Sequence, residues 1–159
     1  MAIQVGDRIP SVTLKHITES GAQEISTDAV FGGKKVVLFA VPGAFTPTCS
    51  ARHLPGFVER ADEFLAKGYA LACTAVNDPF VMKAWAEQGG AAGKITMLPD
   101  GNGAFAKALG LDFDASAFHM GTRSQRYALV AEDGVVRQLW VEKPGAFEVS
   151  SADAVLAQL

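Results

Sequence analysis

The chain has 159 residues, of which 49% are apolar, 19% charged and 9% aromatic. This composition is typical of a globular protein rather than a disordered one, and the length predicts a single domain over residues 1–159. The formal net charge of −3 argues against a nucleic-acid partner, because binding a phosphate backbone needs clustered positive charge. Two cysteines are too few for a disulfide framework or a four-cysteine zinc site, and three scattered histidines form no metal-binding motif.

The N-terminal segment lacks the basic head and the apolar stretch of a secretion signal. No apolar run in the sequence approaches the roughly 18 residues that a membrane-spanning helix needs. We therefore expect a cytoplasmic protein that does not enter a membrane and whose cysteines are kept reduced.

Apolar runs and turn residues predict the strands in the first two-thirds of the chain. Val12–Ile17 alternates moderately and ends at a turn that includes Gly21. The run Val36–Val41 is apolar without alternation, which is typical of a strand covered on both faces. Two further strands are expected over residues 69–76 and 94–98.

Helical spacing and capping residues predict helices between these strands. From Leu54 onward, apolar residues recur at helical spacing until Gly68, and Pro55 should kink this helix near its first turns. Asp78 and Pro79 have the cap and first-position chemistry for a helix over Phe80–Gln88. Shorter helices are expected between Ser26 and Gly32, over Ala104–Leu109 and over Ala152–Leu159.

The last part of the chain changes to an antiparallel pattern. Asp133-Gly134, between Arg126–Ala131 and Val135–Val141, predicts a β-hairpin. Strands that alternate with helices, followed by a hairpin and a helix, predict an α/β sandwich with a mixed central sheet. A thioredoxin-like arrangement fits that order.

The segment Val41–Ser50 joins the end of a buried strand to the start of a helix, which is where open α/β sheets bind ligands. Cys49 would there face unpaired backbone N–H groups and the positive end of a helix dipole, which both favour thiolate over thiol. The alternative is a small buried hydrophobic residue, which is the usual state of a free cysteine. The polar, turn-rich flank of Cys49 favours the reactive interpretation.

Pro42, Thr46 and Cys49 have the spacing Pro-x-x-x-Thr-x-x-Cys. Together with VPGAFTPTCS, HLPGFVERA, VNDPFVMKAW and RYALV in this order, they make the chain resemble the peroxiredoxins, and among them the type II, peroxiredoxin-5-like branch. The resemblance extends from about Asp7 to the C-terminus. It implies a thiol peroxidase on a thioredoxin-like fold, which reduces hydrogen peroxide and organic hydroperoxides through a cysteine sulfenic acid.

The resemblance also implies roles for individual residues. Cys49 would be the peroxidatic nucleophile, Thr46 would hold the peroxide and the thiolate through its hydroxyl, and Pro42 would shield the pocket from water. The family's arginine falls on Arg126, whose guanidinium stays charged at any working pH. Arg123, in an expected loop, is the competing candidate. No bound cofactor is needed, because the oxidised sulfur itself stores the electrons.

Four further residues are expected to line the pocket: Pro47, His53, Phe118 and Met120. His53 follows Cys49 by one helical turn, so a Cys–His hydrolase is an alternative enzyme, although no third group completes it. A single histidine more often satisfies a local hydrogen bond, which favours a structural or pocket-lining His53. Outside the enzymes, the alternative is a redox sensor that relays oxidation of Cys49 to a partner protein.

Cys73 lies in the apolar run 69–76, where it is either an inert buried thiol or the family's resolving cysteine. Some type II members resolve on this strand and others near the C-terminus, where this chain has Val149-Ser150-Ser151 and no cysteine. The recycling thiol is expected to be glutathione with glutaredoxin, or thioredoxin. The family also implies a homodimer, with the loop aromatics Phe45, Phe80 and Phe118 as candidate interface residues.

Overall fold

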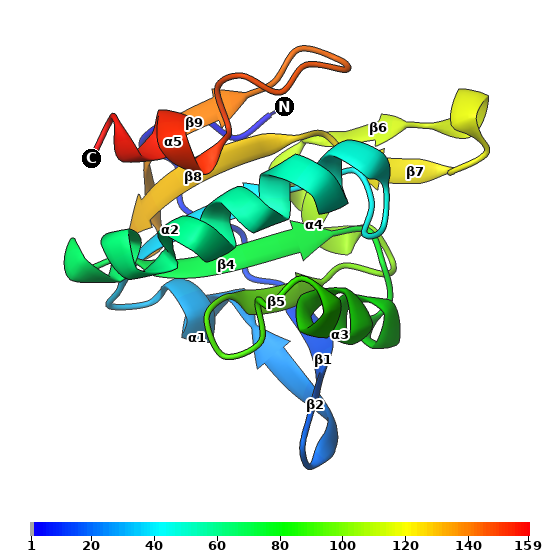
Figure 1. Cartoon of the computed structure of the whole chain (residues 1–159), viewed down its shortest axis with the longest axis horizontal. Helices are drawn as coiled ribbons and strands as arrows, with labels where there is room; N and C mark the ends of the chain where they lie inside the picture. The colour runs from blue at the N-terminus through cyan, green and yellow to red at the C-terminus, as the bar shows by residue number, and fades with distance from the viewer. Residues whose placement is uncertain (1) are drawn as a thin grey trace.

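The computed structural model describes residues 2–159, and its centre is a five-stranded mixed sheet (Figure 1). The strands are β3 (Lys35–Ala40), β4 (Ala70–Ala75), β5 (Thr96–Pro99), β8 (Tyr127–Glu132) and β9 (Val135–Val141). They lie in the order β5-β4-β3-β8-β9; β3, β4 and β5 are parallel, and β8 is antiparallel to both β3 and β9. The expected mixed sheet flanked by helices is confirmed.

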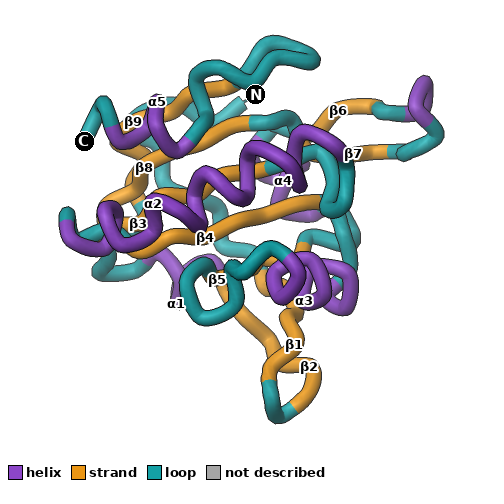
Figure 2. The backbone as a smooth tube through the Cα atoms, in the orientation of Figure 1, coloured by secondary structure: helices purple, strands orange, loops and turns teal. Residues whose placement is uncertain are grey.

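Helices cover both faces of this sheet (Figure 1, Figure 2). They are α1 (Thr27–Phe31), α2 (Leu54–Ala66), α3 (Pro79–Gln88), α4 (Ala104–Leu109) and α5 (Ala152–Leu156). One core contains side chains of α2, α3 and α5, and the other contains side chains of α1 and α4. Consecutive residues of β3 enter alternate cores, Leu38 one and Phe39 the other, so the strand has no polar residue after Lys35.

Two hairpins lie outside the main sheet, and the sequence patterns predict them only in part (Figure 2). β1 (Thr13–Thr18) pairs with β2 (Gly21–Ser26), of which only β1 is predicted, because β2 is polar and mostly exposed. β6 (Asp112–Asp114) pairs with β7 (Thr122–Ser124), so the loop expected before Arg126 is partly a strand. Three-residue strands are too short to leave a periodic pattern.

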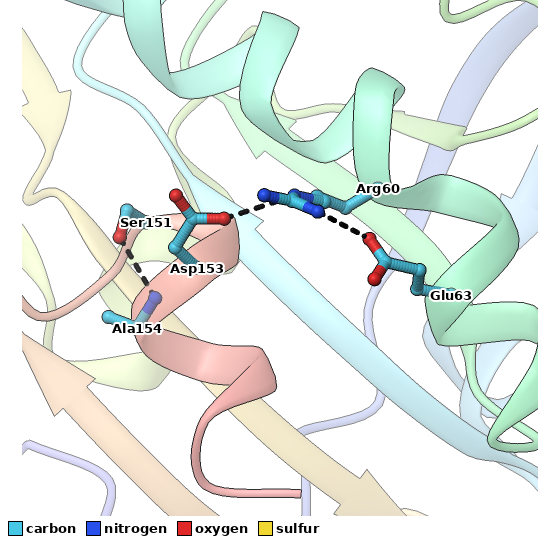
Figure 3. Close-up of polar contacts among 5 residues, drawn as sticks. All are labelled: Arg60, Glu63, Ser151, Asp153 and Ala154. Atoms are coloured by element: carbon cyan, nitrogen blue, oxygen red, sulfur yellow. Dashed lines mark hydrogen bonds and ion pairs between the residues drawn. The ribbon is translucent and has the colours of Figure 1, made fainter.

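The C-terminal helix is shorter than predicted, because α5 ends at Leu156 rather than at Leu159. Its first turn is capped by Ser151, whose Oγ accepts from the Ala154 N–H at 3.1 Å (Figure 3). Arg60 of α2 reaches the Asp153 carboxylate at 3.1 Å in the same view. An exposed ion pair contributes only about 0–1 kcal/mol, so burial of apolar residues such as Val155 holds α5 on α2.

One end of the sheet brings together residues that are far apart in the sequence. β3 ends at Ala40, and the antiparallel register places Tyr127, the first residue of β8, beside it. β9 ends at Val141, which is paired with Tyr127 from the other side. The loop after β3, the residue before β8 and the loop after β9 therefore meet at this end, which we call the active end.

Candidate active site

Cys49 begins a single π-helical turn, Cys49–His53, that leads directly into α2. The Leu54 N–H donates to the carbonyl of Cys49, five residues earlier in the chain. In an α-helix it would donate to the carbonyl four residues earlier. Pro55 has no N–H and so cannot continue the α-helical pattern into this turn. The distortion that Pro55 predicts is thus a wider turn rather than a simple kink. The Cys49 side chain is fully buried within this turn.

Arg126 contacts the Cys49 sulfur directly. Its Nη2 donates to Cys49 Sγ at 3.0 Å, and its Nη1 lies 2.8 Å from His53 Nδ1. None of the ion pairs among residues 2–159 involves Arg126, so no carboxylate neutralises the guanidinium. A cation in this position stabilises a thiolate relative to a thiol.

Arg123, the competing arginine, does not contact the sulfur. Its Nε donates to the Met120 carbonyl at 2.9 Å and its Nη1 to the Val76 carbonyl at 3.0 Å. The same Nη1 would lie 3.5 Å from a Cβ at Gly43, in the loop after β3. Arg123 therefore fastens the β6–β7 hairpin to the segment after β4, next to the loop that carries the cysteine.

The loop between β3 and the π-helical turn is held by hydrogen bonds. The Ala44 N–H donates to Asn77 Oδ1 at 2.8 Å, and the Thr46 hydroxyl donates to the Gly43 carbonyl at 2.6 Å. Phe45 adopts a positive φ of 64°, which a bulky residue takes only where the surrounding loop enforces it. Asn77 was not predicted as a site residue, because its sequence context equally fits a helix cap.

His53 is a buried, hydrogen-bonded ring rather than a partner of the thiol. Its Nε2 lies 2.9 Å from the Ser150 carbonyl, so Nε2 carries the proton and Nδ1 accepts from Arg126. Burial, followed by the charge of Arg126, lowers the pKa of His53 from 6.5 to about 3. The ring is thus neutral at physiological pH, and the Cys–His pair that its spacing suggests is replaced by a His–Arg contact.

The loop after β9 covers this histidine, and Glu142 organises the loop. Glu142 Oε2 accepts from the Ser150 N–H and hydroxyl and from the N–H groups of two preceding residues, at 2.7–2.9 Å. Burial alone would raise the pKa of Glu142, but these hydrogen bonds keep it below its usual value. The ring of Phe147 lies 4.9 Å from the His53 ring and 5.7 Å from the Arg126 guanidinium.

Neither Glu142 nor Phe147 is predicted from the sequence as part of the site. The one available signal is that Glu142 is a charged residue directly after an apolar strand. Such a residue usually faces solvent at a strand end, so the pattern alone does not distinguish it.

Cys73 lies near the middle of β4, opposite Phe39 of β3, and it is fully buried. Its side chain belongs to the same core as Cys49, and both cysteines are free. Burial, with the nearby Cys49 adding to it, raises the pKa of the Cys73 thiol well above its usual range. Cys73 is therefore a protonated and weakly nucleophilic thiol in this structure.

The remaining predicted residues lie at different depths around the active end. Pro42 is half-buried and Pro47 is exposed, while the Met120 methyl would lie 3.3 Å from a Cβ at Gly43. Phe118, in the short turn Ser116–Phe118 between β6 and β7, is 73% exposed. The structure thus brings Met120 against the cysteine loop and leaves Phe118 facing outward.

Two general features complete the description of residues 2–159. No group of three or more histidine, cysteine and carboxylate side chains within this range could hold a metal ion. The same range contains no helix with the length and apolar character needed to cross a membrane.

Comparison with known proteins places these features in a family. The model of the Redoxin family matches residues 4–156. Chloroplastic Peroxiredoxin-2E-2 of Oryza sativa subsp. japonica is 48% identical, with 99% of this chain and 72% of that protein covered. Peroxiredoxin-2B of Arabidopsis thaliana is 45% identical, with 99% and 98% covered. Among solved structures, the crystal structure of reduced Prx3 from Vibrio vulnificus in complex with hydrogen peroxide matches this chain with a TM-score of 0.94. The two sequences are 51% identical, and 98% of each chain is covered.

The chain belongs to the redoxin family as a type II peroxiredoxin. The resemblance inferred from its motifs is confirmed, together with the thioredoxin-like fold. This peroxiredoxin is a thiol-dependent peroxidase, which is an oxidoreductase and not a Cys–His hydrolase.

Proposed function

We propose that Cys49 is the peroxidatic cysteine and that Arg126 stabilises its thiolate. The observation that carries this assignment is the 3.0 Å contact between Arg126 Nη2 and Cys49 Sγ. The thiolate attacks the hydroxyl oxygen of a hydroperoxide and the O–O bond breaks. The other oxygen leaves as hydroxide or alkoxide and takes up a proton to form water or an alcohol. Cys49 becomes a sulfenic acid, oxidised by two electrons.

In the same proposal, Thr46 holds the peroxide and the thiolate through its hydroxyl, and Pro42 shields the site from water. The Thr46 hydroxyl donates to the Gly43 carbonyl, which leaves its lone pairs free to accept from the peroxide O–H. Donors and acceptors fixed along the S–O–O line stabilise the transition state more than the ground state. Pro42 has no N–H and closes the pocket against water.

The substrate range follows from the apolar residues beside the site. Pro47 and Met120 form a weakly selective apolar wall, because such a wall discriminates by only about 1–3 kcal/mol per methylene, whereas Phe118 faces outward and does not contribute within one subunit. Hydrogen peroxide and organic hydroperoxides are therefore both substrates. The Vibrio vulnificus relative whose reduced form was crystallised with hydrogen peroxide supports hydrogen peroxide as a substrate.

A thiol from outside the chain resolves the sulfenic acid. It condenses with Cys49 to form a mixed disulfide and water, and a second thiol then releases the Cys49 thiol. Cys73 is buried in a central strand, and its movement would break ladder hydrogen bonds worth about 1 kcal/mol each. Glutathione with glutaredoxin is thus the favoured reductant, and thioredoxin is the alternative.

The test is turnover of the parent, Cys49→Ser and Cys73→Ser with each donor. We expect Cys49→Ser to be inactive and Cys73→Ser to keep most of its activity with glutathione and glutaredoxin. Activity in Cys49→Ser would overturn the nucleophile assignment. Loss of activity with every donor in Cys73→Ser, with a Cys49–Cys73 disulfide in the oxidised parent by mass spectrometry, would make Cys73 the resolving cysteine.

We also propose a cytoplasmic homodimer that associates through the active end. Three aromatic side chains support this surface, because Phe45, Phe80 and Phe118 are 48%, 70% and 73% exposed. The two free thiols suit a reducing compartment, although chloroplastic relatives occur. A monomer in sedimentation at micromolar concentration would exclude the dimer, and fractionation of the source cells tests the compartment.

A further inference from the structure

Resting on the roles proposed for Cys49 and Arg126, we propose that Glu142 and His53 are positioning residues that aim the Arg126 guanidinium at the sulfur. Glu142 shapes the loop over residues 143–150, that loop fixes His53, and His53 fixes Arg126. We call Glu142, this loop and His53 the buttress.

The first step is the need to orient the guanidinium. An arginine side chain has several rotatable bonds, and one 3.0 Å contact to sulfur does not fix the plane of its fork. The second contact, from Nη1 to His53 Nδ1 at 2.8 Å, fixes that plane. A carboxylate in the place of His53 would bind more strongly but would compete with the thiolate for the positive charge. A neutral imidazole orients Arg126 and leaves its charge to the sulfur.

The second step is the protonation of the ring. His53 accepts from Arg126 only if Nδ1 is unprotonated, which requires the proton to be on Nε2. The Ser150 carbonyl, 2.9 Å from Nε2, selects this tautomer. The ring is also enclosed by Phe39, Phe57 and Phe147, whose centroids lie 4.9–5.6 Å from its own. The site therefore keeps His53 uncharged and in one orientation.

The third step is the placement of the Ser150 carbonyl. The loop before it contains exposed residues and no regular structure, yet its last three N–H groups and the Ser150 hydroxyl all converge on one Glu142 oxygen. Glu142 is 7% exposed, and its own N–H donates to the Arg126 carbonyl at 2.9 Å. The carboxylate that shapes the loop is thus bonded through the backbone to the arginine that the loop orients.

The two amide variants of His53 separate the two ring nitrogens. His53→Asn retains an acceptor near the position of Nδ1, whereas His53→Gln retains a donor near Nε2 and loses the acceptor for Arg126. We expect His53→Gln to lower the rate constant for hydrogen peroxide about 10-fold or more, and His53→Asn to restore much of it. The thiolate absorbance of the folded protein at neutral pH should fall in the same order.

Glu142→Gln tests the other end of the buttress while keeping its shape. We expect a rate loss of several-fold, because the amide accepts more weakly than a carboxylate and brings an N–H₂ group toward backbone donors. Asp153→Asn is the matched control, since it also removes a charge close to the loop but faces solvent. Its rate constant and thiolate absorbance should equal those of the parent.

A double-mutant comparison with Arg126→Ala decides whether the buttress acts through the arginine. In the Arg126→Ala background, His53→Gln should have no further effect on the rate constant. Independent, multiplicative losses would overturn the proposal, and so would parental values in both His53→Gln and Glu142→Gln. If Arg126→Ala itself leaves the rate unchanged, the role proposed for the arginine is wrong instead.

Discussion

At the scale of single residues, the active end uses two arginines in different ways. Arg126 directs one nitrogen at the sulfur, whereas Arg123 binds two backbone carbonyls. Both are half-buried, so exposure does not distinguish them. What distinguishes them is register, because Arg126 directly precedes the strand that is paired with β3.

We predict that Arg126→Ala slows the reaction with hydrogen peroxide about 100-fold, the size of effect seen when a charge-stabilising donor is removed from an active site. Arg123→Ala should cost less than about 10-fold, because it loosens the loop without removing the cation. Stopped-flow rate constants and the rate of alkylation by iodoacetamide measure both effects. The opposite order of the two variants would reverse the assignment.

The sequence predicts the candidate reactive residues, because the chemistry demands particular residue types. It does not predict the residues that orient their side chains. The Pro-x-x-x-Thr-x-x-Cys spacing assigns Thr46 and Cys49, and the family resemblance assigns Arg126, in each case through the residue type. Glu142 acts through backbone N–H groups of a loop with no pattern, and those contacts exist only after the loop has closed. No spacing rule predicts where such a loop folds back.

At the scale of elements, α4 has an unusual N-terminus. Gly103, at its N-cap position, has no side chain to accept from the first-turn N–H groups. Asp100 supplies the missing cap. Its two carboxylate oxygens accept hydrogen bonds from the backbone N–H groups of Phe105 and Ala106, at 2.9 and 2.8 Å. Asp100 is 1% exposed, and burial raises the pKa of its carboxyl although these bonds lower it.

We predict that Asp100→Ala lowers the free energy of unfolding by about 2–3 kcal/mol, because it leaves two buried N–H groups without acceptors. Asp78→Ala, which removes the exposed N-cap of α3, should cost only about 1 kcal/mol. Urea denaturation of both variants provides the comparison. Equal losses would show that burial of the Asp100 cap adds nothing.

Elements that contribute to the two cores were largely predictable, and those outside them were not. β3 and β4 appear in the sequence as apolar runs, and α2 appears as apolar residues at helical spacing, because one or both faces of each element are buried. β2 and the β6–β7 hairpin bury few apolar side chains, so their polar sequences look like loops. The π-helical turn at Cys49 is not predicted for another reason. The spacing of apolar residues indicates a helix but does not show whether each N–H donates to the carbonyl four or five residues earlier.

At the scale of the whole molecule, His53 links stability to pH. Its pKa falls from 6.5 in the unfolded chain to about 3, through burial and then through Arg126. Below pH 6.5 the unfolded state therefore binds more protons, and the free energy of unfolding decreases toward pH 3 by at most about 1.4 kcal/mol per pH unit. Besides Arg126, the charged group that faces His53 is Glu142, whose pKa is lowered. Protonation of Glu142 in acid therefore also lowers the free energy of unfolding.

Urea denaturation between neutral and mildly acidic pH measures this dependence. His53→Asn cannot take up the proton in either state, so we expect its stability to change less between pH 6.5 and pH 5 than that of the parent. An equally steep loss in His53→Asn would assign the dependence to other groups.

The register of β8 on β3 also has a consequence for the chain while it is being made. Cys49 leaves the ribosome early, whereas Arg126, Glu142 and Ser150 are synthesised late. Until β8 has paired, the nascent chain carries an ordinary thiol with no cation beside it, and alkylation of stalled chains of increasing length would reveal when this changes. We therefore expect unfinished and misfolded copies to react with peroxide only at the slow rate of an ordinary thiol.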